Sequence, residues 1–263
     1  MSNANKKIYI GTSGWHYAHW KGPFYPDPVS PDEFLSFYSG RLDSVEINNS
    51  FYRLPRKETL KEWKQTVPHH FLFTIKASRY ITHMKKLKNP EESVGRFFDT
   101  AQALQPKLGP VLFQLPPRWK KNTGRLREFL IALPRGNRYA FEFRDPSWFA
   151  QDVYDLLGAF NCAFCIYELS GVSSPREVTA DFVYIRLHGP GGAYEGKYSR
   201  KALAGWAGAC TVWAQKGEVF CYFDNDQNGY AAGNAVELTE MMSEKRPGST
   251  EAERQRGERK EET

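Results

Sequence analysis

The stretch VEINNSFYRLP, residues 45–55, carries Glu46 and Asn48 among apolar neighbours where a buried strand is expected. Side chains alternate along a strand, so Val45 and Ile47 share one face while Glu46 and Asn48 share the other. In a barrel wrapped by helices, the apolar face packs against the helices and the other face points into the barrel. The stretch therefore predicts a barrel strand that ends with polar side chains pointing inward.

The rest of the chain supplies such a barrel, because short β-type runs alternate with longer amphipathic stretches eight times. The expected strands lie at residues 8–11, 44–48, 71–76, 111–115, 139–144, 163–167, 182–189 and 219–225. This repeat is typical of a TIM (β/α)8 barrel in a single domain, and the absence of GxGxxG after the first run disfavours an open doubly wound sheet. Residues 168–181 are too rich in turn formers for a full helix, so the sixth helix should be reduced or replaced by a loop.

Composition is consistent with one large domain. The 263 residues are 41% hydrophobic and 15% aromatic, which is ample for a core, and the barrel is expected to span residues 1–242. Residues 243–263 hold six basic and six acidic side chains and almost no apolar ones, which predicts a disordered tail. No long uncharged apolar run occurs, and the four cysteines lie inside apolar segments, so we expect a soluble cytoplasmic protein with reduced core thiols and no membrane contact.

The same alternation places further polar side chains at the C-terminal ends of the expected strands, where barrel enzymes build their active sites. The inward set comprises Glu46, Asn48, Thr74, Lys76, Gln114, Glu142, Arg144, Tyr184, Arg186, His188, Tyr222 and Asp224. A structural ion-pair network is the alternative interpretation. Buried ion pairs are costly and can often be replaced by apolar residues without loss of stability. A functional site is therefore the favoured interpretation for so many charges.

The loops beyond these strand ends are rich in aromatic residues and glycine. Such rings can stack on sugars or bases, or they can simply pack the loops together. The rings expected on this face are Trp15, Tyr17, Trp20, Tyr52, Trp119, Trp148, Tyr194 and Tyr198. The segment HGPGG, residues 188–192, could present backbone N–H groups to a phosphate at Gly189. Residues 76–88 and 118–127 contain several basic residues and no acidic ones, which favours an anionic ligand.

These residues predict an enzyme, a hydrolase, lyase or isomerase, that acts on a small anionic or phosphorylated substrate by general acid/base chemistry, with sugar-like molecules among the candidates. The expected catalytic residues are Glu46, Glu142, His188 and Asp224. The expected substrate-binding residues are Trp15, Asn48, Tyr52, Lys76, Gln114, Arg144, Trp148, Arg186, Gly189 and Asn225. The alternative is a protein that binds or processes nucleic acid through its basic and aromatic loops.

Three further hypotheses remain open from the sequence. A hard divalent metal ion could bind Glu46, Glu142, Asp224 and His188, although no cofactor is specified by a motif. Lys76 could form a Schiff base because burial near arginines would lower its pKa, but an ion pair between Lys76 and Glu46 is the favoured expectation. A noncatalytic scaffold would explain the inward acidic residues poorly.

Six motifs, read in order, resemble those of the YecE-like proteins, the domain-of-unknown-function family 72. They are GTSGW (11–15), EINNSFY (46–52), FQLPP (113–117), EFRDPSW (142–148), RLHG (186–189) and YFDNDQNGYAAGNA (222–235). The resemblance covers about residues 8–242, and only the charged tail departs from it. It implies a TIM-barrel fold in a soluble bacterial or archaeal protein, and it implies no particular reaction.

Overall fold

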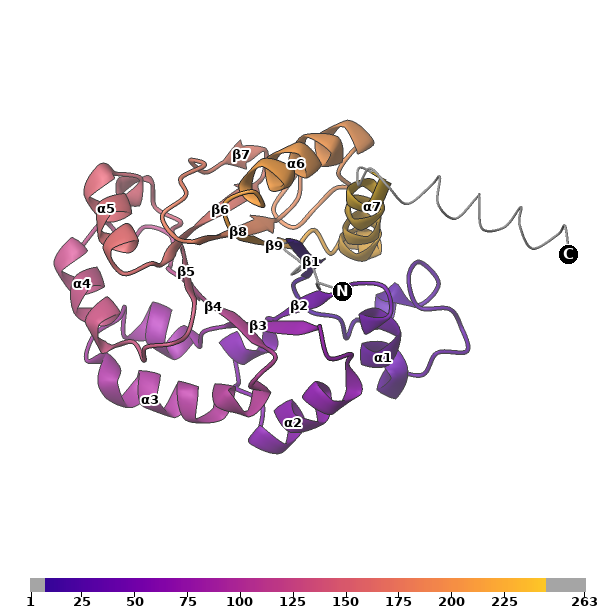
Figure 1. Cartoon of the computed structure of the whole chain (residues 1–263), viewed down its shortest axis with the longest axis horizontal. Helices are drawn as coiled ribbons and strands as arrows, with labels where there is room; N and C mark the ends of the chain where they lie inside the picture. Colours follow the sequence, from indigo (N-terminus) through magenta and orange to yellow (C-terminus); the bar gives the residue numbers. More distant parts are fainter. Residues whose placement is uncertain (1–7, 245–263) are drawn as a thin grey trace, which may run out of the picture.

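The computed structural model describes residues 8–244, which form a nearly closed barrel of parallel strands surrounded by helices (Figure 1). Each strand pairs with its neighbours in the order β1-β9-β8-β6-β5-β4-β3-β2. The barrel strands are β1 (Ile8–Thr12), β2 (Ser44–Ile47), β3 (Leu72–Lys76), β4 (Leu108–Gln114), β5 (Tyr139–Glu142), β6 (Ala163–Leu169), β8 (Phe182–Leu187) and β9 (Glu218–Phe223). The prediction of a single-domain TIM-like barrel is confirmed.

The helices cover the outside of the barrel and follow the strands in the predicted alternation (Figure 1). They are α1 (Phe34–Ser39), α2 (Lys57–Thr66), α3 (Pro90–Ala101), α4 (Thr123–Ala132), α5 (Gln151–Ala159), α6 (Arg200–Trp213) and α7 (Tyr230–Glu244). Start signals in the sequence act as expected, since Asn122 accepts a hydrogen bond from the backbone N–H of Arg125 and Pro90 occupies the first turn of α3.

The connection between β6 and β8 contains no helix, which confirms the predicted loss of the sixth one. All of this connection, residues 170–181, is described. A short strand, β7 (Val172–Ser173), pairs antiparallel with the end of β6 instead. The sequence did not indicate this hairpin, nor the π-helical turn Tyr80–Met84 inside the basic segment after β3.

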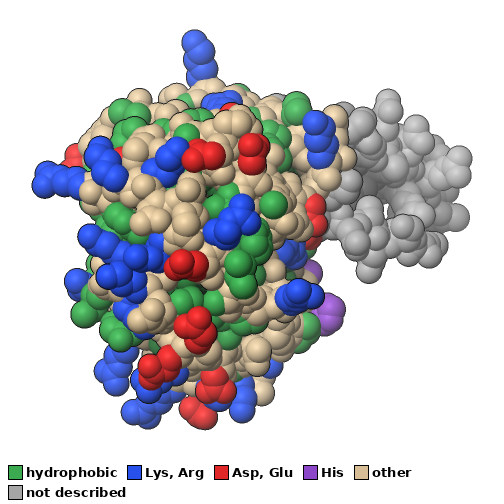
Figure 2. All heavy atoms as spheres, turned by 90° about the vertical axis from the view of Figure 1, so that its left-hand side faces the viewer, with side chains coloured by type: hydrophobic (Ala, Val, Ile, Leu, Met, Phe, Trp, Pro, Cys, Tyr) green, Lys and Arg blue, Asp and Glu red, His purple; other side chains and the backbone are tan. Residues whose placement is uncertain are grey.

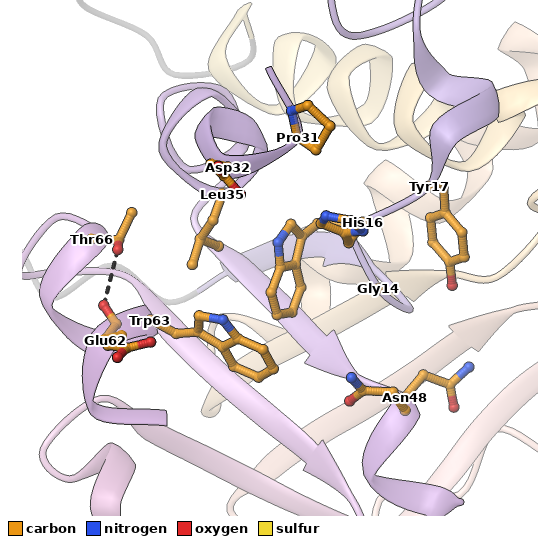
Figure 3. Close-up of a pocket in the computed structure, with 12 residues that line it drawn as sticks. Gly14, His16, Tyr17, Pro31, Asp32, Leu35, Asn48, Glu62, Trp63 and Thr66 are labelled. Carbon is orange, nitrogen blue, oxygen red and sulfur yellow. Dashed lines mark hydrogen bonds between the residues drawn. The ribbon is translucent and has the colours of Figure 1, made fainter. Parts of the chain in front are cut away.

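The barrel closes between β1 and β2 by a narrow seam. Here the regular ladder is replaced by one bridge between Ser13 and Glu46, and the N–H of Gly14 donates to the carbonyl of Glu46 at 2.8 Å. Gly14 has φ +97°, a conformation that favours glycine, and there the chain turns away from the barrel. A cavity of about 580 Å³ lies beside this seam, between the loop after β1 and helix α2 (Figure 3).

The barrel interior has an apolar layer below a polar one, as the alternation of side chains predicted. Leu112, Ala140, Cys165, Tyr184 and Tyr222 belong to the apolar interior cluster. The tyrosine hydroxyls are satisfied inside the barrel. All four cysteines are buried and none forms a disulfide, and Cys162 packs with the helices while Cys165 faces the interior.

The surface formed by α3, α4 and α5 carries Lys and Arg side chains that gather toward one edge (Figure 2). Within residues 8–244, no helix is long and apolar enough to cross a membrane. The first two residues of the tail predicted to be disordered, Ser243 and Glu244, end helix α7 instead, and residues 245–263 lie outside the described residues.

The close approach of β1 and β2 makes Gly11 a sensitive position. A Cβ atom there would lie 1.9 Å from the carbonyl oxygen of Ser44, so Gly11→Ala should lower the free energy of unfolding by about 1–3 kcal/mol. Gly95 in α3 is the matched control because a Cβ meets no atom within 4 Å, and Gly95→Ala should raise stability by about 0.5–1 kcal/mol. Urea unfolding checks both values; equal effects of the two substitutions would contradict the packing at the seam.

Candidate active site at the barrel mouth

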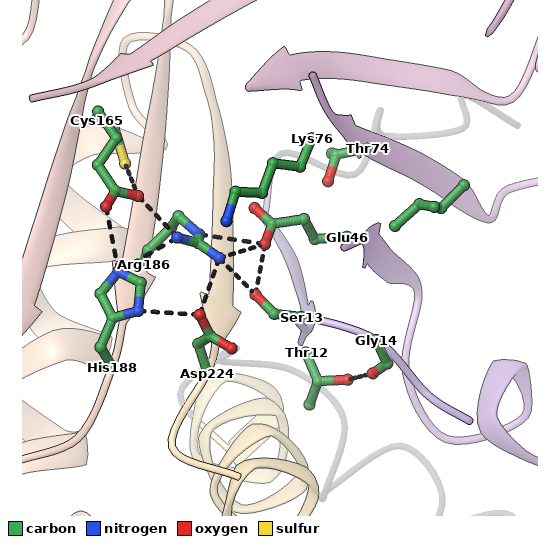
Figure 4. A network of polar contacts seen from close by, with 12 residues as sticks. Thr12, Ser13, Gly14, Glu46, Thr74, Lys76, Cys165, Arg186, His188 and Asp224 are labelled. Carbon is green, nitrogen blue, oxygen red and sulfur yellow. Dashed lines mark hydrogen bonds and ion pairs between the residues drawn. The ribbon is translucent and has the colours of Figure 1, made fainter. Parts of the chain in front are cut away.

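Arg186 on β8 is the centre of a buried ionic network at the C-terminal end of the barrel (Figure 4). Its Nη2 atom contacts Glu46 Oε1 at 2.7 Å and Asp224 Oδ2 at 2.9 Å, and its Nη1 atom contacts Glu142 Oε2 at 2.8 Å. Its Nε donates to Glu46 as well. Nη1 also lies 3.3 Å from His188 Nε2, and Nη2 lies 3.1 Å from the Ser13 hydroxyl. One guanidinium thus ties together acidic side chains from β2, β5 and the end of β9, and none of its five donors remains for a ligand.

The acidic side chains are themselves fully partnered. Glu46 also accepts from the hydroxyls of Ser13 and Tyr184, and Glu142 also accepts from Nε of Arg144. Burial would raise the pKa of Glu142, but Arg144 and Arg186 hold that pKa well below its usual range. Glu46 and Glu142 have no exposed surface. In this conformation both serve as counter-ions to Arg186 and neither faces solvent.

Asp224 and His188 form a second, coupled pair in the network. His188 Nδ1 lies 3.0 Å from Asp224 Oδ2, and His188 Nε2 lies 3.0 Å from Arg144 Nη2. Arginine can only donate, so we assign Nε2 as the acceptor and place the ring proton on Nδ1, facing Asp224. Burial would raise the pKa of Asp224, but Arg186 and the bond with His188 hold it below its usual range. The Tyr194 ring lies 5.5 Å from the His188 ring.

Lys76 differs from Arg144 and Arg186, the other cations at the barrel mouth, because no acidic group in the described chain forms an ion pair with its ammonium. Its Nζ lies 4.4 Å from the centre of the Phe51 ring, and the side chain points toward Arg186 and Glu46 without a direct contact (Figure 4). Burial first, and then repulsion by Arg186, lower the pKa of Lys76 to about 8. The expected Lys76–Glu46 ion pair is therefore wrong, because the Glu46 oxygens already accept from Ser13, Tyr184 and Arg186.

Two of the predicted binding residues carry buried acceptors without a partner. Gln114 Oε1 and Asn225 Oδ1 make no hydrogen bond within residues 8–244. Gln114 pairs in register with Glu142, which places it on the inward face next to the network. The amide nitrogen of Asn225 donates to the Gly196 carbonyl and to Asn234 Oδ1, so Asn225 also holds the loop after β8 in place.

Five other predicted binding residues do not join the network. Trp148 is completely buried, where it stacks on Phe143 and donates to the Trp119 carbonyl, so it packs a loop against the helix layer. Tyr52 is 75% exposed. The N–H of Gly189 already donates to the Tyr198 hydroxyl and is not free for a phosphate. Trp15 and Asn48 line the cavity beside the seam.

The described residues show no arrangement that supports the possible metal site. In the part of the chain that the structure describes, no group of three or more His, Cys, Asp and Glu side chains is placed to hold a metal ion. The physical reason is that Arg186 occupies the point where the three carboxylates converge. His19 binds Asp226 at the surface, and His16 is exposed. The divalent metal stays a prediction.

Three residues that complete the site were not among the predicted catalytic or binding residues. Ser13 bonds Glu46 and Arg186, Phe51 supports Lys76, and His83 lies against Phe51. Extending the strand alternation from Tyr9 through Gly11 would have placed Ser13 inside the barrel. No sequence signal marks Phe51 or His83, because both lie in turns beyond the strands.

Replacement of Arg186 tests whether the network is held by one cation. Arg186→Met leaves three buried acidic groups without their partner and should lower the free energy of unfolding at pH 7 by about 3–5 kcal/mol. Because the pKa values of Glu142 and Asp224 are lowered in the folded state, the wild-type stability they contribute is present above their unfolded values and is lost as pH falls below about 4.5. The penalty of the substitution should therefore shrink in acid.

The control is Arg138→Met, which breaks a pair with Glu218 whose side chains are 35% and 32% exposed. It should cost about 0–1 kcal/mol at either pH. Denaturant unfolding at pH 7 and pH 3.5 checks both variants. Equal losses in the two variants at pH 7 would show that Arg186 does not hold the network.

Comparison with known proteins identifies the family. The sequence matches the family described as "Protein of unknown function DUF72" over residues 9–258. The UPF0759 protein YunF of Bacillus subtilis is 28% identical in an alignment of 273 positions. This alignment covers 89% of this chain and 94% of YunF. The UPF0759 protein YecE of Escherichia coli K12 is 28% identical over 145 residues, which cover 55% of this chain and 51% of YecE.

Solved structures show the same fold. The crystal structure of a DUF72 family protein from Thermotoga maritima matches with a TM-score of 0.80 and 27% identity, covering 90% of this chain and 99% of that one. A DUF72 family protein from Enterococcus faecalis matches with a TM-score of 0.76 and 21% identity, covering 90% and 95%. The family match extends over nearly the whole chain, and the protein therefore belongs to the DUF72 family.

Proposed function

We propose that this protein is an enzyme that binds a small anionic or phosphorylated substrate at the barrel mouth and acts on it by general acid/base chemistry. The observation that carries the proposal is the ammonium of Lys76, which forms no ion pair within the described residues, while the nearby carboxylates of Glu46 and Glu142 are already held by Arg186. A buried cation without a counter-ion costs stability, and a protein that retains one gains from it when an anion binds. The DUF72 relatives add no reaction to this argument.

The surroundings of Lys76 favour a negative ligand. His83, on the π-helical turn, senses the local potential: burial first, and then the positive charges of Lys76, Arg79 and Arg144, lower the pKa of His83 to about 4. Arg144 uses Nε on Glu142 and Nη2 on His188, which leaves Nη1 without a hydrogen-bond partner among the described residues. Lys76 and Arg144 are thus the anion contacts in this proposal, whereas Arg186 is their fixed support.

Proton transfer falls to His188, oriented by Asp224. Arg144 Nη2 lies 3.0 Å and Arg186 Nη1 lies 3.3 Å from His188 Nε2. An anion that draws Arg144 toward itself would leave only the longer contact, which a substrate proton would displace for this nitrogen to act as a base. Gln114 Oε1, which lacks a donor, would accept from a substrate hydroxyl on the same side of the mouth. Glu46 and Glu142 then act by holding Arg186, and the chemistry is a proton transfer within an isomerisation, elimination or hydrolysis.

Anion binding should depend on Lys76 and on its protonation. We expect inorganic sulfate, whose charge is constant in this range, to bind at pH 7 and to bind more weakly as pH rises through about 8, where Lys76 loses its proton. Lys76→Met should abolish both the binding and its pH dependence, while Lys88→Met, at an exposed position, should change neither. Isothermal titration calorimetry between pH 6.5 and pH 9.5 provides the measurement.

The same variant has an opposite effect on stability. The folded-state pKa of Lys76 lies below the unfolded value of 10.5, so the protonated lysine destabilises the fold at pH 7, and this penalty disappears as pH rises from about 8 to 10.5. Lys76→Met should therefore raise the free energy of unfolding at pH 7 by up to about 3 kcal/mol. A Lys76→Met variant that loses stability and still binds sulfate would refute the proposed role.

The rim of the barrel supports a second candidate, nucleic-acid binding. The basic segments after β3 and β4 lie side by side, because Arg125 Nη1 donates to the Lys86 carbonyl at 3.3 Å. Lys86, Lys88, Arg118 and Arg127 are exposed and form no ion pair within the described residues. This rim would contact phosphates spaced along a polymer, outside the mouth.

Binding to a polymer should weaken steeply with salt. Fluorescence anisotropy with single-stranded and double-stranded DNA and RNA should show a loss of affinity of at least tenfold between about 50 and 200 mM salt. Lys86→Gln combined with Arg127→Gln should reduce this salt slope, and Lys216→Gln, in the exposed turn after α6, should not. Affinity too weak to measure at low salt would exclude this function.

A further inference from the structure

The cavity beside the β1–β2 seam contains features that the barrel mouth lacks. Its volume of about 580 Å³ lies within the range of small-molecule sites. The loop after β1, the turn after β2, the start of α1 and the end of α2 enclose it (Figure 3). The floor includes Trp15 and Leu35, which are 6% and 5% exposed, and Trp63 is a half-buried wall. The base of the cavity is therefore apolar.

The two tryptophans offer one aromatic face to a ligand. Their rings meet edge to face, with centroids 4.7 Å apart and an interplanar angle of 89°. A nucleobase binds best between parallel rings, and this pair provides no such slot. A ring whose C–H groups lie flat against a single indole fits the arrangement better, and sugars have that shape.

The polar groups of the cavity favour hydroxyl groups over an anion. The side-chain amides of Asn48 and Asn49 make no hydrogen bond to the described chain, so both can donate to and accept from a ligand. Asp32 and Glu62 add carboxylate acceptors at the rim. Among the described residues, no Lys or Arg lines the cavity. An uncharged ring with several hydroxyl groups matches this lining, and a phosphate does not.

One short turn joins the cavity to the anion site. Asn48 and Asn49 line the cavity, and Phe51, two residues later, supports the ammonium of Lys76. The turn is fixed at its centre, because the hydroxyl of Ser50 contacts the Ile47 carbonyl at 2.8 Å and the Lys76 carbonyl at 2.6 Å. A ligand with two parts could therefore contact both sides of this turn at once.

We infer that the cavity binds the uncharged sugar ring of a sugar phosphate, whose phosphate group contacts Lys76 and Arg144. The ring is recognised by the indole of Trp63 and by the amides of Asn48 and Asn49. The position of the phosphate rests on the function proposed above, whereas the position of the ring rests on the cavity alone. The two parts can consequently fail separately.

Calorimetric titration with three classes of probe separates the two parts. Inorganic phosphate tests the mouth, uncharged methyl glycosides test the cavity, and a panel of pentose and hexose phosphates tests both together. We expect at least one sugar phosphate to bind about tenfold or more tightly than inorganic phosphate. Trp63→Ala and Asn48→Leu should each remove this advantage and leave the affinity for phosphate unchanged, whereas Lys76→Met should weaken both ligands.

Trp213→Ala is the matched control, since Trp213 is a half-buried tryptophan on α6, across the barrel from α2 (Figure 1). It should lose similar packing and keep the sugar advantage. Sugar phosphates that bind no more tightly than phosphate, or an advantage that survives both Trp63→Ala and Asn48→Leu, would overturn the cavity inference and leave the proposed function standing. Glycoside binding that depends on Trp63 without any phosphate binding would support the cavity and overturn the anionic substrate.

Discussion

The contact between Arg186 and three acidic side chains is the constraint on which the upper half of the barrel depends. Glu46, Glu142 and Asp224 come from strands on different sides of the ring, and only a guanidinium with its fixed fork of donors meets all of them. Removing these charges from water is costly, so the arrangement is favourable only because every oxygen facing Arg186 is partnered. The network also supports the seam, since Ser13 and Glu46 form the bridge between β1 and β2.

This saturation gives each charge at the mouth a distinct role. Arg186 and its acidic partners cannot bind a ligand without breaking the network. A ligand must therefore be bound by groups at the edge of the network. Within residues 8–244, Lys76 has no counter-ion, Arg144 has a free donor, and Gln114 has a free acceptor. The network around Arg186 is already formed before a ligand binds, and the unpaired groups of Lys76, Arg144 and Gln114 lie beside it. Such preorganisation favours binding and catalysis. The same feature explains why Lys76 should cost stability.

Alternation of side chains along strands predicted most of the barrel and the inward polar set. It succeeded for Glu46, Glu142, Arg186 and Asp224 because a strand fixes which way each side chain points. Alternation could not predict how the charges pair. The expected ion pair of Lys76 with Glu46 was therefore wrong, because Glu46 accepts from Ser13, Tyr184 and Arg186 instead. Beyond the strand ends the rule has no force. Trp148 therefore packs into the helix layer, and the amide of Gly189 is used by Tyr198.

We infer that the ionic network around Arg186 holds the barrel mouth in place and leaves the ammonium of Lys76 available to bind an anion. A high-resolution crystal structure of the protein grown in phosphate tests it most directly. The account predicts an anion within hydrogen-bond distance of Lys76 Nζ and Arg144, above an intact set of contacts between Arg186 and its three carboxylates. A mouth without an anion, in which Lys76 pairs with Glu46 or Glu142, would contradict it.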